Sequence, residues 1–279
     1  MHPDPQAREL LPHRAHNPSV DVVETAIEIS DVSKSFGRNR VLDGVSLKIR
    51  KGSIAVMLGP SGTGKSVLLR CIVGLLKPDS GSVKVFGEDV AALNPNKAAD
   101  RAKLFAVRRR IGMLFQDGAL FDDMTVGDNI AFPMRMHTKL SEAKIREAVA
   151  DKLERVGLKG VEPKFPSELS GGMRKRVAFA RAIALEPDIV LCDEPSSGLD
   201  PVMASTLDEL ILHLHKTLGM TFVVISHDTA EALKIADTMG LLYRGKLLTY
   251  GPKEEVLRSN HPGLRQFFAR ETAGPIKVV

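Results

Sequence analysis

The stretch Gly59-Pro60-Ser61-Gly62-Thr63-Gly64-Lys65-Ser66 decides the fold of this chain. It follows an apolar run over residues 53–58 and opens a helical apolar pattern that extends from Val67 to Leu75. In the order strand, glycine-rich loop, helix, the pattern G-x-x-x-x-G-K-S binds phosphate, because the glycines turn backbone N–H groups toward phosphate oxygens at the positive end of the helix. We predict that Lys65 binds the β- and γ-phosphates of a nucleotide and that Ser66 is a ligand of Mg²⁺. The alternative is a glycine turn with a solvated lysine.

The composition predicts a soluble globular protein of one large or two small domains, since 43% of the 279 residues are hydrophobic and 26% are charged. A net charge of +5 and a pI near 9.2 would allow a nucleic acid or an anionic membrane surface as a partner. The basic residues are spread widely, however, and they cluster only at 108–110 and 174–176. We favour solvated helix faces for these clusters and predict no specific nucleic-acid partner.

Neither a targeting segment nor a membrane span is predicted. Residues 1–17 are polar and rich in Pro and His, unlike a signal peptide, and no apolar run approaches the roughly 20 residues of a spanning helix. Any membrane attachment is therefore expected to come through a partner. Cys71 and Cys192 lie in apolar stretches, which is typical of small buried hydrophobic residues in a reducing compartment.

The hydrophobic pattern predicts an α/β fold. Alternating segments at 27–29, 32–36, 41–49 and 82–86 indicate an antiparallel β layer, whereas the apolar runs 188–193 and 221–226 are typical of central parallel strands. A helical pattern over about 95–187 indicates an inserted helical subdomain, in which 141–158 is the clearest helix. We also expect a helix from Pro201 to Leu218 and a hairpin of 239–243 with 246–250. The domains are then a flexible tail at 1–24, a core at 25–251, and a helical tail at 252–279.

Two acids follow one of the central strands. Asp193 can bind Mg²⁺ beside Ser66, and Glu194 can polarise the attacking water. The alternative is a pair of solvated acids at a strand end. His227 follows the next apolar strand, and because the ends of parallel strands converge on one crevice, it can reach the γ-phosphate.

A second glycine pair, Gly171-Gly172, follows Ser170 and enters a helix that we expect from Met173 to Leu185. This pair forms another anion site, although the chain already has a complete phosphate loop. We infer that the second site acts in trans, so that two chains enclose two nucleotides in a twofold dimer.

These motifs resemble those of ATP-binding cassette (ABC) ATPases, in that family's order across residues 27–250. Residues 59–66 are similar to the Walker A motif, Gln116 to the Q-loop, 169–173 to the signature motif, 189–194 to the Walker B motif, 197–200 to the D-loop, and His227 to the switch histidine. The chain departs from the family where Phe36 stands for the commoner Tyr, Met173 for Gln and Gly198 for Ala.

The resemblance implies a set of site residues. Mg²⁺ would be bound by Ser66, Gln116 and Asp193, and catalysis would rest on Lys65, on Glu194 as the group that activates water, and on His227 as the group that holds the γ-phosphate. Phe36 would stack on adenine, and Asp200 would communicate across the dimer. ATP would be bound in one chain by Phe36, Gly59, Pro60, Ser61, Gly62, Thr63, Gly64, Lys65, Ser66, Val67 and Gln116, and from the other chain by Ser170, Gly171, Gly172 and Asp200.

Within that family, residues 113–130, 167–173, 182–188 and 265–267 look like those of the ATPase subunit of Mla-type phospholipid transporters, which serve MCE-domain lipid-transfer proteins. This resemblance implies a homodimer on the cytoplasmic face of the bacterial inner membrane, held there by permease subunits (MlaE-like). It also implies an MCE-domain protein (MlaD-like) and in some systems a STAS-domain subunit (MlaB-like) as partners. We expect the segment after Gln116, residues 119–130, to contact the permease, and the apolar residues Leu264, Phe267 and Phe268 to brace the dimer or a partner.

Two alternatives stay open. One is the ATPase of an importer for a polar solute such as an amino acid. The other is a soluble ABC ATPase that acts on DNA or ribosomes, a class that usually has two cassettes or a long coiled coil, whereas this chain has one cassette and no sustained heptads.

Overall fold

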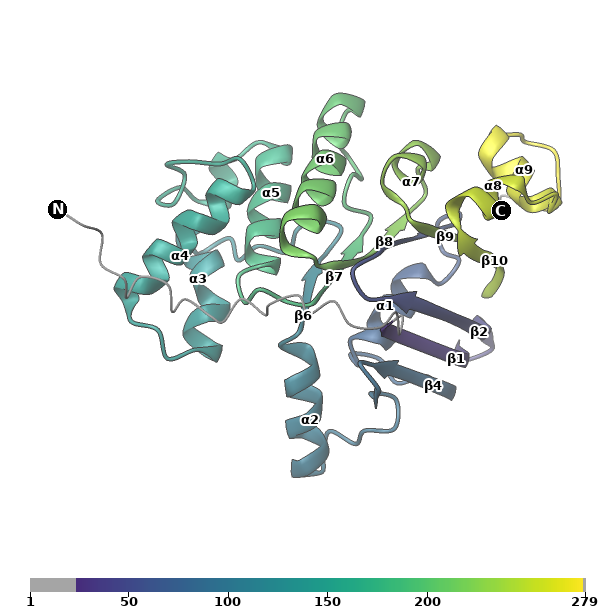
Figure 1. Ribbon diagram of the computed structural model, residues 1–279, viewed down its shortest axis with the longest axis horizontal. Helices are drawn as coiled ribbons and strands as arrows, with labels where there is room; N and C mark the ends of the chain where they lie inside the picture. Colours follow the sequence, from purple (N-terminus) through teal and green to yellow (C-terminus); the bar gives the residue numbers. More distant parts are fainter. Residues whose placement is uncertain (1–23, 278–279) are drawn as a thin grey trace.

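The computed structural model describes residues 24–277, which form two sheets with helices around them (Figure 1). All but one residue of the expected tail at 1–24 lie outside the described residues. The larger sheet has the order β10-β9-β3-β8-β7-β6, and the smaller has the order β2-β1-β4-β5. The predicted fold class, a mostly parallel sheet with an antiparallel layer and helices, is confirmed.

The larger sheet is parallel except for its last strand. Strands β6 (Ile111–Leu114), β7 (Ile189–Asp193), β8 (Thr221–Ser226), β3 (Ile54–Leu58) and β9 (Thr238–Tyr243) run in one direction, and β10 (Lys246–Pro252) returns antiparallel to β9. Every residue of β3, β7 and β8 is buried, because both faces of the sheet are covered. Along β3, Val56 belongs to the core under the helices, and its neighbour Met57 belongs to the core shared with the antiparallel sheet.

The antiparallel sheet consists of β1 (Thr25–Phe36), β2 (Asn39–Arg50), β4 (Ser80–Val85) and the short β5 (Glu88–Asp89). The two segments expected at 27–29 and 32–36 are one continuous strand. Its pairing with β2 shifts register between Ile29 and Val32, and Asp31 between them has a φ of 50°. A β-bulge therefore interrupts the alternation without ending the strand.

Two predicted boundaries between α1 and β6 were wrong. Helix α1 (Lys65–Ile72) ends before Leu75, which is 56% exposed, because Gly74 turns the chain with a φ of +67°. The range 95–187 expected to be helical contains β6, which follows α2 (Ala98–Arg108) and pairs with β7 in the larger sheet. Gly112 allows this strand to approach α5 (Gly171–Ala182), since a Cβ there would lie 2.2 Å from the carbonyl oxygen of Ala182.

The helical part of the structure begins after β6. It contains α3 (Val126–His137), α4 (Glu142–Arg155), a 3₁₀ turn at Pro166–Glu168 and α5 (Gly171–Ala182). Ser141 caps α4 as the sequence predicts, since its side chain accepts a hydrogen bond from the Lys144 N–H. Figure 1 shows α3 and α4 at one end of the molecule, with α5, α6 (Pro201–Leu218) and α7 (Thr229–Ile235) following along one face of the larger sheet.

The chain closes with α8 (Lys253–Arg258) and α9 (Pro262–Ala269). Leu264 is 2% exposed, Phe267 and Phe268 pack against the same core, and the buried Gln266 side chain bonds both backbone groups of Ile276. The apolar side chains of this tail are thus already packed within one chain. Whether the tail also braces a partner stays a prediction.

The structure differs from the prediction that both basic clusters form solvated helix faces, because several of their side chains make contacts within the protein. Arg108 donates to the carbonyls of Val73 and Gly74, Arg110 pairs with Asp188 at 2.7 Å, and the buried Lys175 donates to the Gln116 carbonyl. Both cysteines are buried and free, as predicted. Among the described residues, no helix combines the length and apolar character needed to cross a membrane.

Candidate functional site

The carboxyl ends of β3, β7 and β8 bring the predicted phosphate-binding and acidic residues together. In the parallel register Leu58 lies opposite Ser226, and Asp193 lies opposite Ile225. The loop from Gly59, the acids after Cys192 and the histidine after Ser226 therefore leave the sheet at the same edge. This convergence is what the sequence pattern predicts for a nucleotide crevice.

The glycine-rich loop fits between β3 and α1 because two of its glycines have no room for a side chain. A Cβ on Gly59 would lie 2.3 Å from the carbonyl oxygen of Leu242, and one on Gly64 would lie 2.6 Å from that of Val41. Gly64 also has a φ of +100°, a backbone conformation that favours glycine. The loop thus approaches its neighbours closely and presents its amides at the start of α1.

Lys65 is buried within this loop. Its ammonium donates to the carbonyls of Gly59 at 2.7 Å and Pro60 at 2.9 Å, and lies 3.9 Å from a carboxylate oxygen of Glu194. Burial lowers the pKa of Lys65, while the charges of Glu194 and Asp193 raise it. A buried cation within the glycine-rich loop, close to a carboxylate, fits the role expected for the lysine of a phosphate loop.

Ser66 and Asp193 form a pair suited to Mg²⁺. The Ser66 hydroxyl donates to Oδ1 of Asp193 at 2.8 Å. Burial raises the pKa of Asp193, and the hydrogen bond from Ser66 lowers it. A hydroxyl and a carboxylate are hard oxygen donors, and a few such ligands beside substrate phosphates are how proteins bind Mg²⁺, so the residues present fit that ion.

Glu194 lies at the centre of the cluster. Its carboxylate is 3.9 Å from Lys65 Nζ on one side and 3.3 Å from Nδ1 of His227 on the other. Its own backbone has a φ of +48°, uncommon for a non-glycine residue, and its N–H donates to the carbonyl of Ile225. The backbone therefore fixes a carboxylate between a buried cation and an imidazole, a position from which it can accept a proton.

Gln116 and Phe36 are the remaining residues expected to contact the nucleotide or its metal ion from the same chain. Gln116 follows β6 and is exposed. Within residues 24–277 its side chain makes no hydrogen bond with Ser66 or Asp193, which bond each other. The structure therefore does not bring the three expected Mg²⁺ ligands together. Phe36 ends β1 with half of its surface exposed, on the hairpin whose residues Val41 and Leu42 cover Gly64. An exposed ring beside the phosphate loop is available for stacking.

The second glycine pair lies at the start of α5. Ser170 is the N-cap, since its side chain accepts from the Met173 N–H, so the helix begins at Gly171 and not at Met173 as expected. A Cβ on Gly172 would lie 2.1 Å from Cε of Met203, whose N–H bonds the side chain of Asp200. Ser170 and Asp200 therefore lie on neighbouring loops, yet among the described contacts no hydrogen bond or ion pair joins them to residues 59–66 of the same chain.

Sequence reasoning missed Lys175. Its ammonium donates to the backbone carbonyl of Gln116 and ties α5 to the segment after β6. Burial lowers its pKa, and Asp117 and Glu194 raise it. The only sequence signal was its place in a basic run, which is typical of an exposed helix face.

The comparisons agree with this geometry. The family model described as ABC transporter matches residues 42–197. The "probable ribonucleotide transport ATP-binding protein" Mkl of Mycobacterium leprae is 46% identical over 251 residues, 90% of this chain and 71% of that protein. The intermembrane phospholipid transport system ATP-binding protein MlaF of Escherichia coli K12 is 43% identical over 254 residues, 91% of this chain and 92% of that protein.

Solved structures give the same fold. CbiO1 of Clostridium perfringens, part of the ABC transporter complex cbiONQ, has a TM-score of 0.74 and 28% identity, covering 84% of this chain and 91% of that one. The ATP-binding cassette MJ0796, in a dimeric post-hydrolysis state bound to ADP and Pi, has a TM-score of 0.73 and 29% identity, covering 81% of this chain and 98% of that one.

Proposed function

The chain belongs to the ABC transporter family, and from that premise we propose that it is the ATP-hydrolysing subunit of a transporter that moves phospholipid between membranes. As in the rest of the family, it binds nucleotide and couples ATP hydrolysis to transport. The assignment of the catalytic residues rests on the position of Glu194, whose carboxylate lies between Lys65 and His227.

In this proposal the phosphate-loop amides and Lys65 hold the β- and γ-phosphates, and Phe36 stacks on the adenine. Ser66 and Asp193 would hold Mg²⁺, with Gln116 as a further ligand, and the ion would supply positive charge to the phosphates. Glu194 accepts the proton of the attacking water, and His227 holds the γ-phosphate.

The second half of each site comes from another copy of the chain. Ser170, Gly171, Gly172 and Asp200 form an anion-binding edge at the start of α5 that has no contact with the phosphate loop of its own chain among the described residues. Two copies related by a twofold axis can each place this edge against the nucleotide of the other. ATP then binds the closed dimer more tightly than the open one, and this difference drives the permease.

A cavity of about 320 Å³ lies beside the segment after Gln116, and we assign it to the permease. Its walls are mostly apolar and include Ile111, Met113, Phe115, Phe121 and Phe132, with Arg181 at one side. An apolar groove between the parallel sheet and the helical part suits a short helix of a partner. Its position agrees with the surface expected from residues 119–130.

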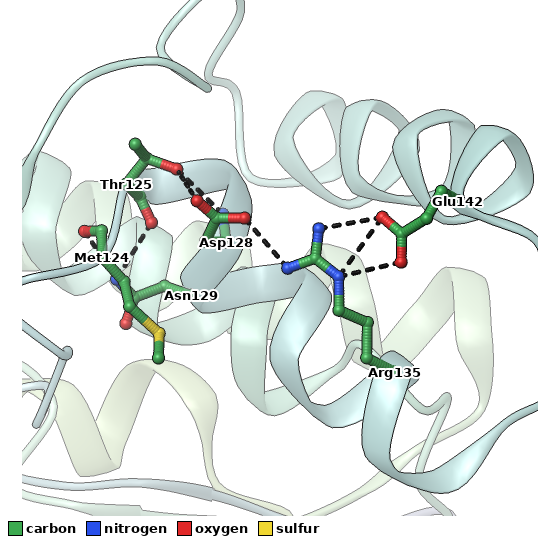
Figure 2. Close-up of polar contacts among 6 residues, drawn as sticks. All are labelled: Met124, Thr125, Asp128, Asn129, Arg135 and Glu142. Carbon is green, nitrogen blue, oxygen red and sulfur yellow. Dashed lines mark hydrogen bonds and ion pairs between the residues drawn. The ribbon is translucent and has the colours of Figure 1, made fainter.

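A polar network joins the start of α3 to the start of α4 (Figure 2), and Asn129 connects it to Phe121 in the wall of the groove. The buried side chain of Asn129 accepts from the N–H of Phe121 and donates to the carbonyls of Phe121, Met124 and Thr125. Arg135 joins Asp128, on the same helix, to Glu142 at the start of α4. The groove wall at Phe121 is thus hydrogen-bonded to α3, and α3 is ion-paired with α4.

The substrate is where the relatives differ. The name of MlaF gives intermembrane phospholipid transport, and that of Mkl gives ribonucleotide transport. We place this chain with the first, because MlaF matches over nearly its whole length and the segments 113–130 and 265–267 resemble Mla-type subunits. A ribonucleotide transporter is the second candidate, on the strength of the 46% identity to Mkl.

The partners follow from this placement: a dimer of this chain, two MlaE-like permease subunits, an MlaD-like MCE-domain protein and, in some systems, an MlaB-like STAS-domain subunit. The chain would then lie at the cytoplasmic face of the bacterial inner membrane, attached through the permease.

The proposal is tested by purifying the complex with its untagged genomic neighbours and reconstituting it in vesicles. We expect co-purification of a permease and an MCE-domain protein, bound phospholipid, and ATP-dependent movement of labelled phospholipid that is lost in Glu194→Gln. ATP-dependent uptake of a ribonucleotide with no movement of phospholipid would establish the second candidate. Normal hydrolysis by Glu194→Gln would exclude Glu194 as the base.

A further inference from the structure

Helix α5 holds the segment after β6, residues 116–119, through two cationic side chains. The buried Lys175 donates to the backbone carbonyl of Gln116. Further along the helix, Arg181 donates to the carbonyls of Gly118 and Ala119, both at 2.7 Å. Hydrogen bonds from a charged donor are stronger than those between neutral groups, so α5 and this segment are firmly joined.

The backbone conformation of the segment is stabilised by these bonds. Gly118 has a φ of +77° and Ala119 a φ of +50°, which is uncommon for a residue other than glycine. Such a conformation persists only where its surroundings stabilise it. The planar guanidinium of Arg181 presents two N–H groups side by side, and the successive carbonyls of this turn accept them. A Cβ on Gly118 would lie 3.2 Å from Cβ of Ala178, so the segment also packs closely on α5.

Both cations lose hydration in this position. Burial lowers the pKa of Lys175 and that of Arg181, because the charged form is removed from water. Within residues 24–277 neither side chain has an ion-pair partner, and carbonyl oxygens of the segment accept its hydrogen bonds. An apolar side chain would avoid the loss of hydration, but it could not bind a carbonyl. We therefore attribute a specific role to the bonds between α5 and residues 116–119.

The segment begins with Gln116, the further ligand of Mg²⁺ in the function proposed above. Among the described residues its side chain has no hydrogen bond with Ser66 or Asp193, which bond each other. Strand β6 ends at Leu114, and α5 holds the carbonyl of Gln116, so the reach of this side chain toward Ser66 and Asp193 depends on the position of α5. The same helix carries residues 170–172 at its start.

We propose that Lys175 and Arg181 are positioning residues for ATP hydrolysis, which fix residues 116–119 to α5 and so place Gln116 for the metal ion. This inference rests on the role proposed above for Gln116. Lysine and arginine have no acceptor atom, so neither cation is itself a ligand, and both act through Gln116. Residues 170–172, assigned to the nucleotide of the opposite chain, and Gln116, assigned to that of its own chain, then share one support.

The test measures Mn²⁺ binding by electron paramagnetic resonance, because Mn²⁺ takes the same oxygen ligands as Mg²⁺. Complexes of full-length chains that carry Glu194→Gln are loaded with ATP, freed of unbound nucleotide and titrated with Mn²⁺. We expect Lys175→Met and Arg181→Met each to raise the dissociation constant of Mn²⁺ about tenfold, because a ligand loses its support. Arg176→Met is the matched control, since it removes a charge from the same helix and Arg176 has no side-chain hydrogen bond or ion pair within residues 24–277. Its constant should stay within about twofold of the Glu194→Gln parent.

A double-mutant cycle with Gln116→Ala shows whether the effect passes through that side chain. If it does, adding Lys175→Met or Arg181→Met to Gln116→Ala raises the constant no further. Arg181→Lys, which keeps the charge and a donor, should restore the constant to within about threefold of the parent. Unchanged Mn²⁺ binding in both methionine variants, an equal loss in Arg176→Met, or additive effects in the cycle would each overturn the proposal. Retention of ATP by the same complexes tests the proposed ATPase function separately, so failure of the two is distinguishable.

Discussion

Removal of the Glu231 charge should stabilise the protein at high pH. Glu231 is buried on α7, and burial raises its pKa in the folded chain to about 7, against 4.5 for an ordinary glutamate. The folded state therefore binds this proton more tightly than the unfolded state, and stability falls as pH rises from 4.5 to about 7. The change, at about 1.4 kcal/mol per pH unit, amounts to about 3 kcal/mol in total.

Glu231→Gln has no proton to lose at this position, so the part of the fall in stability that comes from Glu231 should be absent from the variant. We expect the variant to gain about 2–3 kcal/mol relative to the parent between pH 5 and pH 8.5, which for a chain of this size is a shift in melting temperature of roughly 5–10 °C. Asp208 is one of the causes that raise the pKa of Glu231, so the difference between the two proteins includes the loss of this repulsion as well as the loss of the buried charge.

Thermal melts of both proteins at pH 5, 6, 7 and 8.5 measure the effect. Glu209→Gln is the matched control, because Glu209 lies beside Asp208 on α6 but is 69% exposed, and its ion-pair partner within residues 24–277 is Lys234. Its difference from the parent should stay flat across the same pH values. A flat difference for Glu231→Gln, or a variant less stable than the parent at pH 8.5, would show that the buried carboxyl is not the destabilising group.

Three further predictions concern the site and the tail. Asp193→Asn should raise the Mg²⁺ concentration for half-maximal ATPase activity at least about tenfold. ATP binding without Mg²⁺, measured by a filter-binding assay, should be nearly unchanged. An unaltered Mg²⁺ dependence would show that Asp193 is not a ligand of the ion. In urea unfolding, Gly64→Ala should lower the free energy of unfolding by about 2 kcal/mol more than Gly37→Ala does. Both positions have a positive φ, but of the two only Gly64 lies against a backbone carbonyl. Equal losses of stability would mean that this close approach is unimportant. Truncation after Ser259 should lower the melting temperature, because it exposes the core beneath Leu264. It should also weaken assembly with the partner subunits, measured by size-exclusion chromatography. If assembly is intact, the tail stabilises its own chain and does not brace the dimer or a partner.

The elements that the sequence predicts well are those that local pattern determines. Strands β3, β7 and β8 are continuous apolar runs, and α6 begins at Pro201 after an Asp200 cap and ends before Gly219. The convergence of Glu194 and His227 also follows from pattern, because parallel strands end at one edge.

Structural features that depend on tertiary contacts cannot be predicted from the local sequence pattern. Strand β6 has only four residues between a basic run and Gln116, and its pairing with β7 is visible only in the fold. Glu231 reads as a helix-capping glutamate, since nothing in its neighbours shows that Ser226 takes over that role. Gln116 remains apart from Ser66 and Asp193 in the single chain, so its place among the Mg²⁺ ligands depends on closure of the site.

The most direct test of the account is a count of trapped ATP in dimers with mixed subunits. In a Glu194→Gln background, one set of dimers carries Lys65→Ala in one copy and Ser170→Arg in the other, and a second set carries both changes in the same copy. If each site combines the phosphate loop of one chain with the Ser170 loop of the other, the first set keeps one intact site and traps about one ATP per dimer, and the second traps none. One ATP in the second set and none in the first would mean that each chain builds its site alone, and would contradict the account.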